Sequence, residues 1–437
     1  MTSARPAKGV RTRPAPSRGK GASAGPRSSL RFVNLHYAPD VASTGQHLTD
    51  LAEWLAGVGH EVEVWTGRGR YDGGDVDAPA WEERNGVRVR RLWTPGAGRR
   101  TLAHRSLEYA TFLAQAAGRA ALESVPDLTV YLTTPSHLPA VGWLARRLRG
   151  TPYGIWSMDL HPEFEVAVGL YKEDGLLARG LRAMSTAAYR DAAFVVDLGP
   201  TMKRRLADRG LPETRLKTIP VWNRADEVVP VDREETPFRE RWGLGAAFTV
   251  MYSGNAGLGH RFDVVLEAAR RLEECDEGVE FLFVGGGPRR EEIERAAARL
   301  GLERFRYRDY VPRERLAESL SVGDVHLVTL RRETAGLAAP GKLYGIMAAG
   351  RPVVMLGPAD SDPGAVIGQH GVGAIVEPDR EDDPAGHLAN LLLSLRDQAD
   401  HRRHLGQRAR RVFEKEFSRE VCCRRWQRLI TDRVADG

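Results

Sequence analysis

The sequence predicts an α/β protein with two doubly wound parallel sheets, and three observations support this prediction. Short runs of β-branched and aromatic residues alternate with amphipathic helical stretches, the pattern of parallel strands joined by right-handed helical crossovers. Around residues 198–241 this alternation stops in a passage rich in Pro and charged residues, and it then starts again. A length of 437 residues also favours two domains of about 200 residues each. We therefore expect two Rossmann-like domains facing a cleft, with ligands bound beyond the carboxyl ends of the strands.

The first domain is expected over residues 30–222, after a leader of residues 1–29. Its predicted strands are 31–37, 61–66, 86–93, 128–133, 153–158 and 194–196, and an amphipathic helix is predicted over 46–57. A linker is expected at 223–241 and the second domain at 242–396, with predicted strands 248–252, 280–284, 305–307, 325–330, 352–356 and 373–376. Residues 397–437 are strongly helical and basic, and we expect them to pack back on the first domain.

Composition and cysteine usage indicate a soluble protein of a reducing compartment. Hydrophobic residues make up 42% and charged residues 28% of the chain, and no apolar stretch approaches the roughly 18 residues that a transmembrane helix needs. The first residues lack the apolar core of a signal peptide. Cys275, Cys422 and Cys423 provide neither a disulfide framework nor a metal site. A cytoplasmic location is therefore expected.

The net charge of +6 is concentrated in the leader. Residues 1–29 contain seven basic residues and no acidic one, so the rest of the chain has a formal charge near −1. The leader is rich in Pro, Gly, Ala and Ser and is expected to be disordered. Two roles fit it: an inert solvated segment, or peripheral contact with an anionic membrane at the inner face of the cell, worth on the order of 1 kcal/mol per basic residue. Arg99, Arg100 and Arg105 fit a membrane-facing loop and an ordinary solvated surface equally well. A nucleic-acid partner is not expected, because the rest of the chain has no net basic charge.

Two predicted strand-to-helix junctions are rich in small residues but weak as signals. The first, 36–45, ends at Gly45 and would let a substrate approach the backbone where a helix starts, and a surface turn explains it equally well. It lacks the G-x-G-x-x-G spacing of a dinucleotide site. The other, 284–288, contains Gly286, and a simple turn is the preferred interpretation there.

A third junction, 252–261, suits a diphosphate. Gly254 and Asn255 begin a segment with three glycines, and His260 and Arg261 end it. A diphosphate is bound by backbone N–H groups together with positive charge, and this segment supplies both.

The fourth junction, 333–352, is the most informative. Pro340 suits the first position of a helix, and Lys342 then falls in the first turn, where the helix dipole disfavours a cation by roughly 0.3–1 kcal/mol. An anionic ligand held by Lys342 and the free N–H groups would remove this conflict. An ion pair with Glu333 would remove it equally well, so the residues alone leave both alternatives open.

A cluster of titratable residues follows the predicted strand 153–158. Asp159, His161 and Glu163 lie where the strand should face the cleft, a suitable place for a general base or for groups that bind sugar hydroxyls. A structural histidine is the alternative. The segment Asp360-Ser361-Asp362 resembles a metal-binding D-x-D, but prolines flank it and we interpret it as an exposed loop, so no metal site is expected.

The fourth junction carries a specific resemblance. Its core, P-x-K-L-Y-G-I-M-A-A-G-R-P-V-V, resembles the donor-binding segment of family-four glycosyltransferases, in particular the bacterial WbuB-like subgroup that builds surface polysaccharides. Supporting motifs are H-Y-A-P-D with its later glycine, G-H-E-V-E-V-W-T-G, D-L-H-P-E, Y-S-G-N-A-G-L, and F-V-G-G-G-P followed by D-Y-V-P. They cover nearly the whole chain except the leader. The resemblance implies the GT-B fold, a nucleotide-diphosphate sugar donor, no metal and no cofactor, retention of anomeric configuration, and an acceptor that is a lipid-linked glycan or a cell-surface polysaccharide precursor.

The resemblance also implies roles for individual residues. Gly254 and Asn255 match the donor-phosphate loop, Gly286 and Val311 fall where backbone surrounds the base, and Asp159 and His161 match the acceptor side near the reacting carbon. In full, the donor residues are Gly254, Asn255, Arg261, Gly286, Val311, Glu333, Gly336, Pro340, Gly341, Lys342, Leu343 and Tyr344, the acceptor-side residues are Gly45 and Glu163, and the catalytic residues are His161, Asp159 and Lys342.

Several positions depart from the family pattern. Many relatives carry two glutamates, the second of which grips the ribose, and these positions are Leu337 and Gly345 here. Asn255 and His260 replace the usual arginine and lysine of the phosphate loop, which leaves Arg261 and Lys342 as candidate replacements. Two rival functions follow: a sugar-nucleotide epimerase of the same fold, and a catalytically silent protein that binds a sugar nucleotide.

Overall fold

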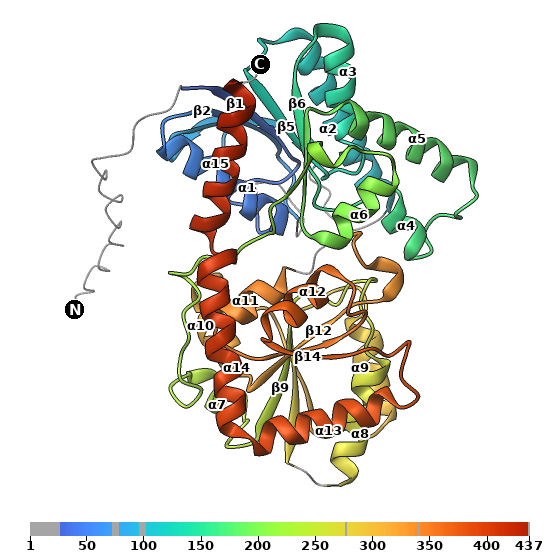
Figure 1. Cartoon of the computed structure of the whole chain (residues 1–437), viewed down its shortest axis with the longest axis vertical. Coiled ribbons are helices and arrows are strands. Elements are labelled where there is room, and N and C mark those ends of the chain that lie inside the picture. Colours follow the sequence, from blue (N-terminus) through green and yellow to red (C-terminus); the bar gives the residue numbers. More distant parts are fainter. Residues whose placement is uncertain (1–26, 72–77, 96–101, 276–277, 339–340, 436–437) are drawn as a thin grey trace, which may run out of the picture.

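The computed structural model describes residues 27–71, 78–95, 102–275, 278–338 and 341–435. Two parallel sheets lie one above the other along the long axis, each with helices on both faces (Figure 1). The predicted fold class is confirmed. Among the described residues, no helix has both the length and the apolar character needed to cross a membrane.

The upper sheet has the strand order β3-β4-β2-β1-β5-β6-β7-β8. Its strands are β1 Ser29–Val33, β2 Glu61–Gly67, β3 Trp81–Arg84, β4 Val87–Leu92, β5 Leu128–Leu132, β6 Tyr153–Trp156, β7 Phe194–Asp197 and β8 Leu216–Thr218. The helices around it are α1 Ser43–Gly57, α2 Leu102–Leu122, α3 Pro139–Arg149, α4 Glu163–Ala167, α5 Leu176–Asp191 and α6 Pro200–Asp208. All six strands predicted for the first domain are present, although β1 ends four residues earlier than expected.

Two strands of this sheet were not predicted. β3 pairs antiparallel with β4 through a two-residue turn, in which Asn85 and Gly86 have φ of 50° and 80°. Asn-Gly is the usual sequence of such a turn, so the signal was available in the sequence. The other addition is β8, which lies in the passage where the alternation of strands and helices stops.

The lower sheet has the order β11-β10-β9-β12-β13-β14, and all its described pairs are parallel. Its strands are β9 Phe248–Ser253, β10 Val279–Val284, β11 Phe305–Arg308, β12 Val325–Thr329, β13 Val353–Leu356 and β14 Gly373–Val376. The helices are α7 Pro237–Arg241, α8 Asp263–Glu274, α9 Arg290–Arg299, α10 Leu316–Leu320, α11 Lys342–Ala348, α12 Asp362–His370 and α13 Pro384–Asp397. Each predicted strand of the second domain overlaps an observed one.

The end of the predicted linker packs with the lower sheet. Phe238 on α7 lies 4.5 Å from Trp242 between ring centroids, and both are buried with Met251 of β9. Residues 237–241 therefore belong to the second hydrophobic core.

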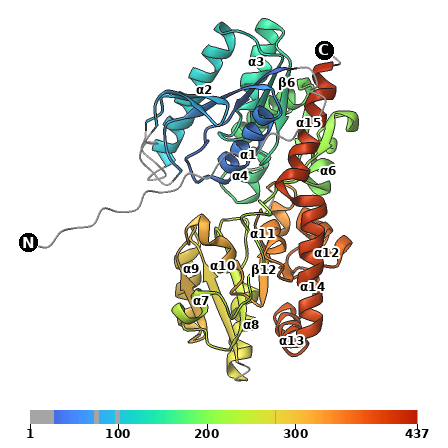
Figure 2. The same ribbon diagram turned by 90° about the vertical axis from the view of Figure 1, so that its left-hand side faces the viewer.

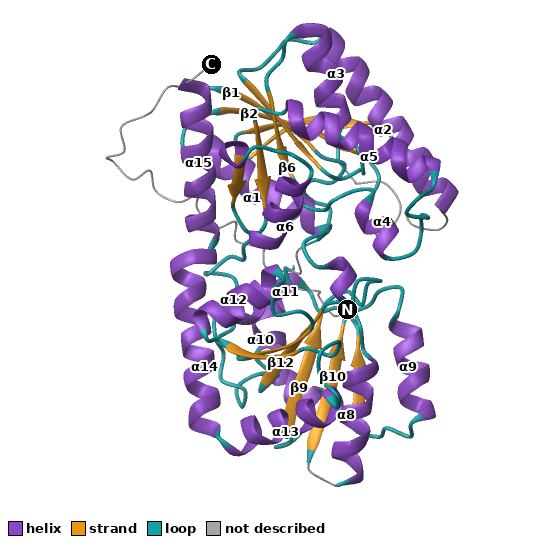
Figure 3. Cartoon of the chain, turned by 45° about the vertical axis from the view of Figure 1, so that its right-hand side comes forward, coloured by secondary structure: helices purple, strands orange, loops and turns teal. Residues whose placement is uncertain are grey.

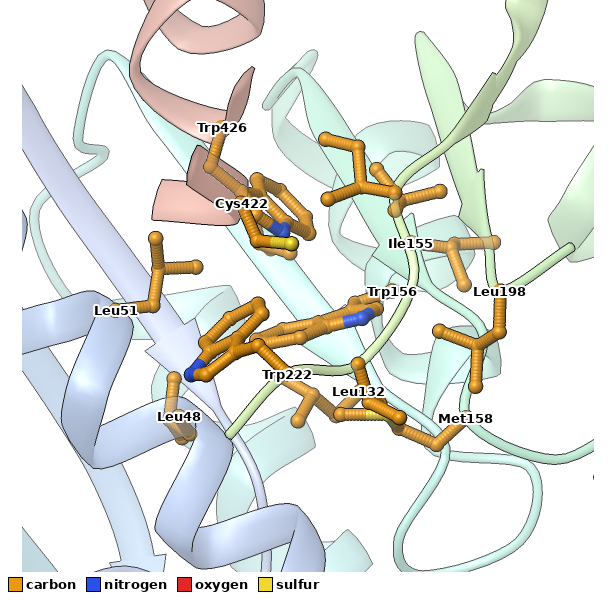
Figure 4. Packing of buried hydrophobic residues seen from close by; sticks show 14 of the residues in the cluster. Leu48, Leu51, Leu132, Ile155, Trp156, Met158, Leu198, Trp222, Cys422 and Trp426 are labelled. Carbon is orange, nitrogen blue, oxygen red and sulfur yellow. The ribbon is translucent and has the colours of Figure 1, made fainter. Parts of the chain in front are cut away.

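The C-terminal helices run along one side of both domains (Figure 2). α14, Ala399–Val412, continues through a π-helical turn, Phe413–Phe417, into α15, Arg419–Ala435. α15 packs on the first domain, where Trp426 lies 4.8 Å from Trp156 and Trp156 stacks on Trp222 at 5.6 Å (Figure 4). The chain leaves the second domain and completes the core of the first.

Candidate functional site

The loops at the facing ends of the two sheets touch each other. Asp159 forms an isolated antiparallel bridge with Ala338, and the N–H of Leu160 donates to the carbonyl of Leu337 at 2.8 Å. Arg205 on α6 donates from Nε to the carbonyl of Ala335 at 2.6 Å. Figure 3 shows α6 of the first domain facing α11 and α12 of the second. The loop after β6 and the loop before α11 are thus one joined structure.

Gly336 is tightly packed in this contact. It has a φ of 70°, and a Cβ added there would lie 2.8 Å from Cγ2 of Thr201 and 3.1 Å from the N of Met202. Only glycine fits this position without moving α6. Gly336, expected to bind the donor, therefore also sets the distance between the domains.

The segment Asp360-Ser361-Asp362 is not an exposed loop, and that interpretation was wrong for two of its residues. Ser361 and Asp362 are buried, and Oδ1 of Asp362 accepts from the N–H of Thr201 at 2.7 Å, capping α6 across the cleft. Burial raises the pKa of Asp362. The Asp360 side chain remains exposed at 58%. Among the described residues no group of three or more His, Cys, Asp or Glu side chains is placed to hold a metal ion.

Lys342 begins α11 and points at the junction after β9. Its Nζ lies 3.9 Å from the centroid of the Tyr252 ring and donates to Tyr252 Oη, and His260 Nε2 is 3.5 Å away. A Cβ added to Gly254 would lie 3.4 Å from Cε of Lys342. The third and fourth predicted junctions, 252–261 and 333–352, therefore converge on one lysine.

No described carboxylate lies within 4.0 Å of Lys342 Nζ. Glu333 is exposed and does not pair with it, so the ion-pair alternative is excluded for the described residues. Burial lowers the pKa of Lys342 to about 7. Burial, reinforced by Lys342, lowers the pKa of His260 to about 3, and its Nδ1–H donates to the carbonyl of Thr329 at 2.6 Å. A buried cation beside a neutral imidazole is costly until an anion joins it.

The glycines after β10 close against the junction after β9. The N–H of Ala256 donates to the carbonyl of Gly286 at 2.7 Å, and a Cβ on Gly285 would lie 2.3 Å from the carbonyl oxygen of Gly254. The preferred interpretation, a turn, accounts for these glycines. Beside them Tyr310 is 61% exposed, and its ring edge is 3.3 Å from where a Cβ on Gly286 would lie.

Other expected donor residues lie elsewhere or act through the backbone. Arg261 pairs with Asp263 at 2.8 Å and Asp379 at 2.7 Å, so two carboxylates already compensate its charge in this structure. Its phosphate role stays a prediction. The side chains of Leu343 and Tyr344 are buried in the core, which leaves only their backbone to a ligand.

The remaining donor residues have the following places. Asn255 is exposed, Val311 is half-buried, Gly341 precedes α11, and Pro340, like Arg99 and Arg100, lies outside the described residues.

The acceptor side differs from expectation in one carboxylate. Glu163 pairs with Arg209, and with Arg182 at 3.4 Å, so it is held as a structural ion pair and its acceptor-side assignment is not supported. Glu165 contacts the histidine instead: His161 Nδ1 lies 2.7 Å from Glu165 Oε1 and 2.9 Å from Oε2. The i,i+4 spacing could have identified this pair.

Asp159 keeps its carboxylate free of hydrogen bonds to described side chains. Its N–H donates to Thr133 Oγ1 at 3.0 Å, and burial raises the pKa of its carboxyl. Gly45 lies in the first turn of α1, after β1, where a Cβ would be 2.9 Å from the carbonyl carbon of His36. Gly45 therefore serves the packing of α1 on the loop after β1.

One polar residue near the donor junction was missed. Position 345, where relatives carry a glutamate, faces Asn223, whose Nδ2 would lie 3.2 Å from a Cβ on Gly345. Asn223 falls at the start of the predicted linker, and no local pattern marks it.

Two family models match the chain. Residues 44–222 match the "Glycosyl transferase 4-like domain", and residues 247–394 match "Glycosyl transferases group 1". Together they cover every strand of the two sheets except β1. The chain is a family-four glycosyltransferase with the GT-B fold.

Individual proteins agree with this assignment. The glycosyltransferase is 25% identical over 380 residues to the Escherichia coli K12 protein named "Putative colanic acid biosynthesis glycosyl transferase WcaI", a match that covers 83% of this chain and 92% of that protein. Sucrose-phosphate synthase from Thermosynechococcus elongatus superposes with a TM-score of 0.73 at 18% identity, over 94% of this chain and 100% of that one. Anabaena HepE in complex with UDP-glucose superposes with a TM-score of 0.69 at 15% identity, over 93% and 100%. Membership of the WbuB-like subgroup stays a prediction.

Proposed function

We propose that this glycosyltransferase moves a sugar from a nucleotide-diphosphate sugar onto a lipid-linked glycan or cell-surface polysaccharide precursor. The observation that carries the donor class is Lys342, a half-buried cation that faces the glycine-rich junction after β9 and pairs with no described carboxylate. A diphosphate supplies the missing negative charge. The names of similar proteins agree, since WcaI is named for colanic acid biosynthesis and HepE holds UDP-glucose.

The proposed chemistry needs no metal and retains the anomeric configuration. As the bond between the anomeric carbon and the phosphate oxygen breaks, negative charge grows on the departing diphosphate. Lys342 and the backbone N–H groups around Gly254 and Gly341 stabilise this charge, the role that a metal ion has in other transferases. We place the base near Gly286 and Val311, and we assign the amide of Asn223 as the polar group nearest the ribose.

The acceptor side of the proposal rests on the loop after β6. Asp159 and His161 orient the attacking hydroxyl or take its proton, since they lie on the loop that is joined to the loop leading to Lys342. A lipid-linked acceptor also fits work in the cytoplasm with peripheral contact at an anionic membrane.

A thermal-shift screen tests the donor class without the acceptor. UDP-glucose, UDP-N-acetylglucosamine, GDP-mannose and GDP-fucose are compared with free glucose, and a nucleotide sugar at about 100 times its dissociation constant should stabilise the protein by about 2.7 kcal/mol. Lys342→Met should abolish the shift, and the exposed Lys172→Met should keep it. Stabilisation by none of the nucleotide sugars would refute the proposal. Incubation with the donor alone tests for an epimerase, which would convert the nucleotide sugar without an acceptor. Loss of turnover when divalent metal ions are chelated would refute the metal-free mechanism.

A further inference from the structure

The acceptor side holds a cluster of titratable side chains that the donor chemistry does not use. His137 follows β5, His161 follows β6, and Glu165 lies on α4. The two histidines line one pocket together with Thr133 and Tyr189. We propose that Glu165, His161 and His137 form a hydrogen-bond relay that receives the attacking hydroxyl of a sugar acceptor, with Glu165 as a positioning residue. This inference rests on the proposed function and specifies its acceptor site.

Glu165 determines which ring nitrogen of His161 carries the proton. A carboxylate only accepts, so the 2.7 and 2.9 Å contacts place the proton on Nδ1 and leave Nε2 with a free lone pair. Burial raises the pKa of Glu165, but the hydrogen bond from His161 outweighs this and brings the pKa below its usual value. The side chains of His161 and Glu165 are only 13% and 15% exposed, so water competes little for this contact.

His137 is held in an unusual state beside this pair. Its φ of 69° is rare for a residue with a side chain and costs on the order of 1–3 kcal/mol. Its ring centroid lies 6.3 Å from that of His161, and its buried Nδ1 has no hydrogen-bond partner among the described residues. Burial, with a smaller effect of His161, lowers the pKa of His137 to about 4. A neutral ring with an unsatisfied nitrogen is suited to bind a hydroxyl without competing for its proton.

Two simpler explanations of this cluster are that His137 bonds to a neighbouring side chain and that the three residues bind a metal ion. The surroundings support neither. The groups that face the relay are Asp159 on the same loop, Ser136, whose Oγ lies 3.5 Å from Glu165 Oε1, and Tyr189 on α5, whose hydroxyl is already bonded to Ser157 Oγ at 2.9 Å. None of them bonds to His137 Nδ1 among the described residues. The two histidines and the glutamate also do not converge on a metal position. A hydroxyl-bearing ligand is what the cluster lacks.

The chemical step balances within the site. The acceptor oxygen forms a bond to the anomeric carbon, and its proton passes to Nε2 of His161. The bond from that carbon to the phosphate oxygen breaks, and its electron pair leaves with the diphosphate. The positive charge on His161 is stabilised by Glu165, and the proton is then released to water.

Histidine side-chain NMR tests the relay independently of any substrate. In the protein labelled with ¹⁵N-histidine and assigned through His137→Asn and His161→Asn, His161 should show a protonated Nδ1 and an unprotonated Nε2 at pH 7.5. His137 should stay neutral from pH 8 down to about pH 5. A protonated Nε2 on His161, or a His137 that titrates near pH 6.5, would overturn the proposal.

Kinetics test the same relay with a matched pair of variants. Glu165→Gln removes the carboxylate that contacts His161, whereas Glu163→Gln alters a carboxylate of the same helix that pairs with arginines. With UDP-glucose, or the panel member that binds best, donor hydrolysis should fall at least about 10-fold in kcat for Glu165→Gln with unchanged KM, and its acidic pH limb should shift. Glu163→Gln should keep the wild-type profile. If the two variants had the same kcat and the same pH profile, the relay would be refuted. The donor assignment would be unaffected, because it is tested separately by the thermal shift with UDP-glucose. If no donor is hydrolysed, the NMR result decides.

Discussion

Raising the pH should weaken the binding of a nucleotide-diphosphate sugar, because Lys342 loses its proton near neutrality in the empty site. Burial lowers the pKa of this lysine to about 7, so it is about 90% protonated at pH 6.0 and about 3% protonated at pH 8.5. A bound diphosphate holds the proton on, since an opposite charge within a few ångströms favours the charged form. The dissociation constant should therefore rise about 30-fold between these pH values, equivalent to about 2 kcal/mol.

Calorimetry with UDP-glucose, or the panel member that binds best, measures this effect directly. The charge of its diphosphate does not change between pH 6.0 and 8.5, so a pH dependence of binding reports a group of the protein. Titration in buffers of different ionisation enthalpy should show that close to one proton is taken up on binding at pH 8.5. Lys342→Met should bind weakly at every pH, with no pH dependence, and Lys172→Met should behave as the wild type. A pH-independent dissociation constant in the wild type would refute the assignment of Lys342 as the cation that meets the donor.

The same lysine should lower the stability of the empty protein. Because its folded pKa lies below its unfolded value, the unfolded state binds more protons between about pH 7 and 10.5, and the cost is largest below pH 7. Lys342→Met should therefore raise the free energy of unfolding at pH 7 by about 1–3 kcal/mol while it abolishes donor binding. A variant that loses both stability and binding would point to a structural role instead.

Three further substitutions test how the domains are held. Gly336→Ala should reduce turnover and cost about 1–3 kcal/mol, since its Cβ would meet the backbone of α6, whereas Gly368→Ala, which meets nothing within 4 Å, should be neutral or stabilising. Asp362→Ala removes the cap on α6 from the other domain and should lower the urea midpoint by an amount equivalent to about 1–2 kcal/mol. Trp426→Ala should cost about 3–5 kcal/mol in calorimetric unfolding, while Trp93→Ala, 59% exposed, should change little; similar losses for both would contradict the packing of α15.

The parts of this protein that could be predicted from sequence are those set by local pattern. Periodicity located all twelve predicted strands, because buried parallel strands are short apolar runs with helices between them. The conflict between Lys342 and the start of its helix also pointed to the donor junction. This conflict could not show whether Lys342 binds an anionic ligand or pairs with Glu333, because the position of the Glu333 side chain depends on the folded chain.

What the sequence could not show is which partner each charged side chain meets in the folded chain. Arg261 looked free for a phosphate, but Asp379 reaches it from 118 residues away. Glu163 and Glu165 both lie in the first turn of α4, and only the turn of that helix decides which one meets His161. The sequence around Asp362 suggested an exposed loop, but its side chain is buried because α6 of the other domain begins against it.

The contact between the domains and the proposed donor site depend on the same short segment. The loop before Lys342 bonds to the first domain through Ala335, Leu337 and Ala338, and the lysine at its end faces the proposed diphosphate. Each such hydrogen bond contributes only about 0.5–1.5 kcal/mol. The summed free energy of these contacts between the domains is therefore of a size that the free energy of ligand binding can match. Under the proposed function, a donor bound at Lys342 therefore stabilises the contact between the domains, and breaking that contact weakens donor binding. The coupling is reciprocal, because one segment takes part in both interactions.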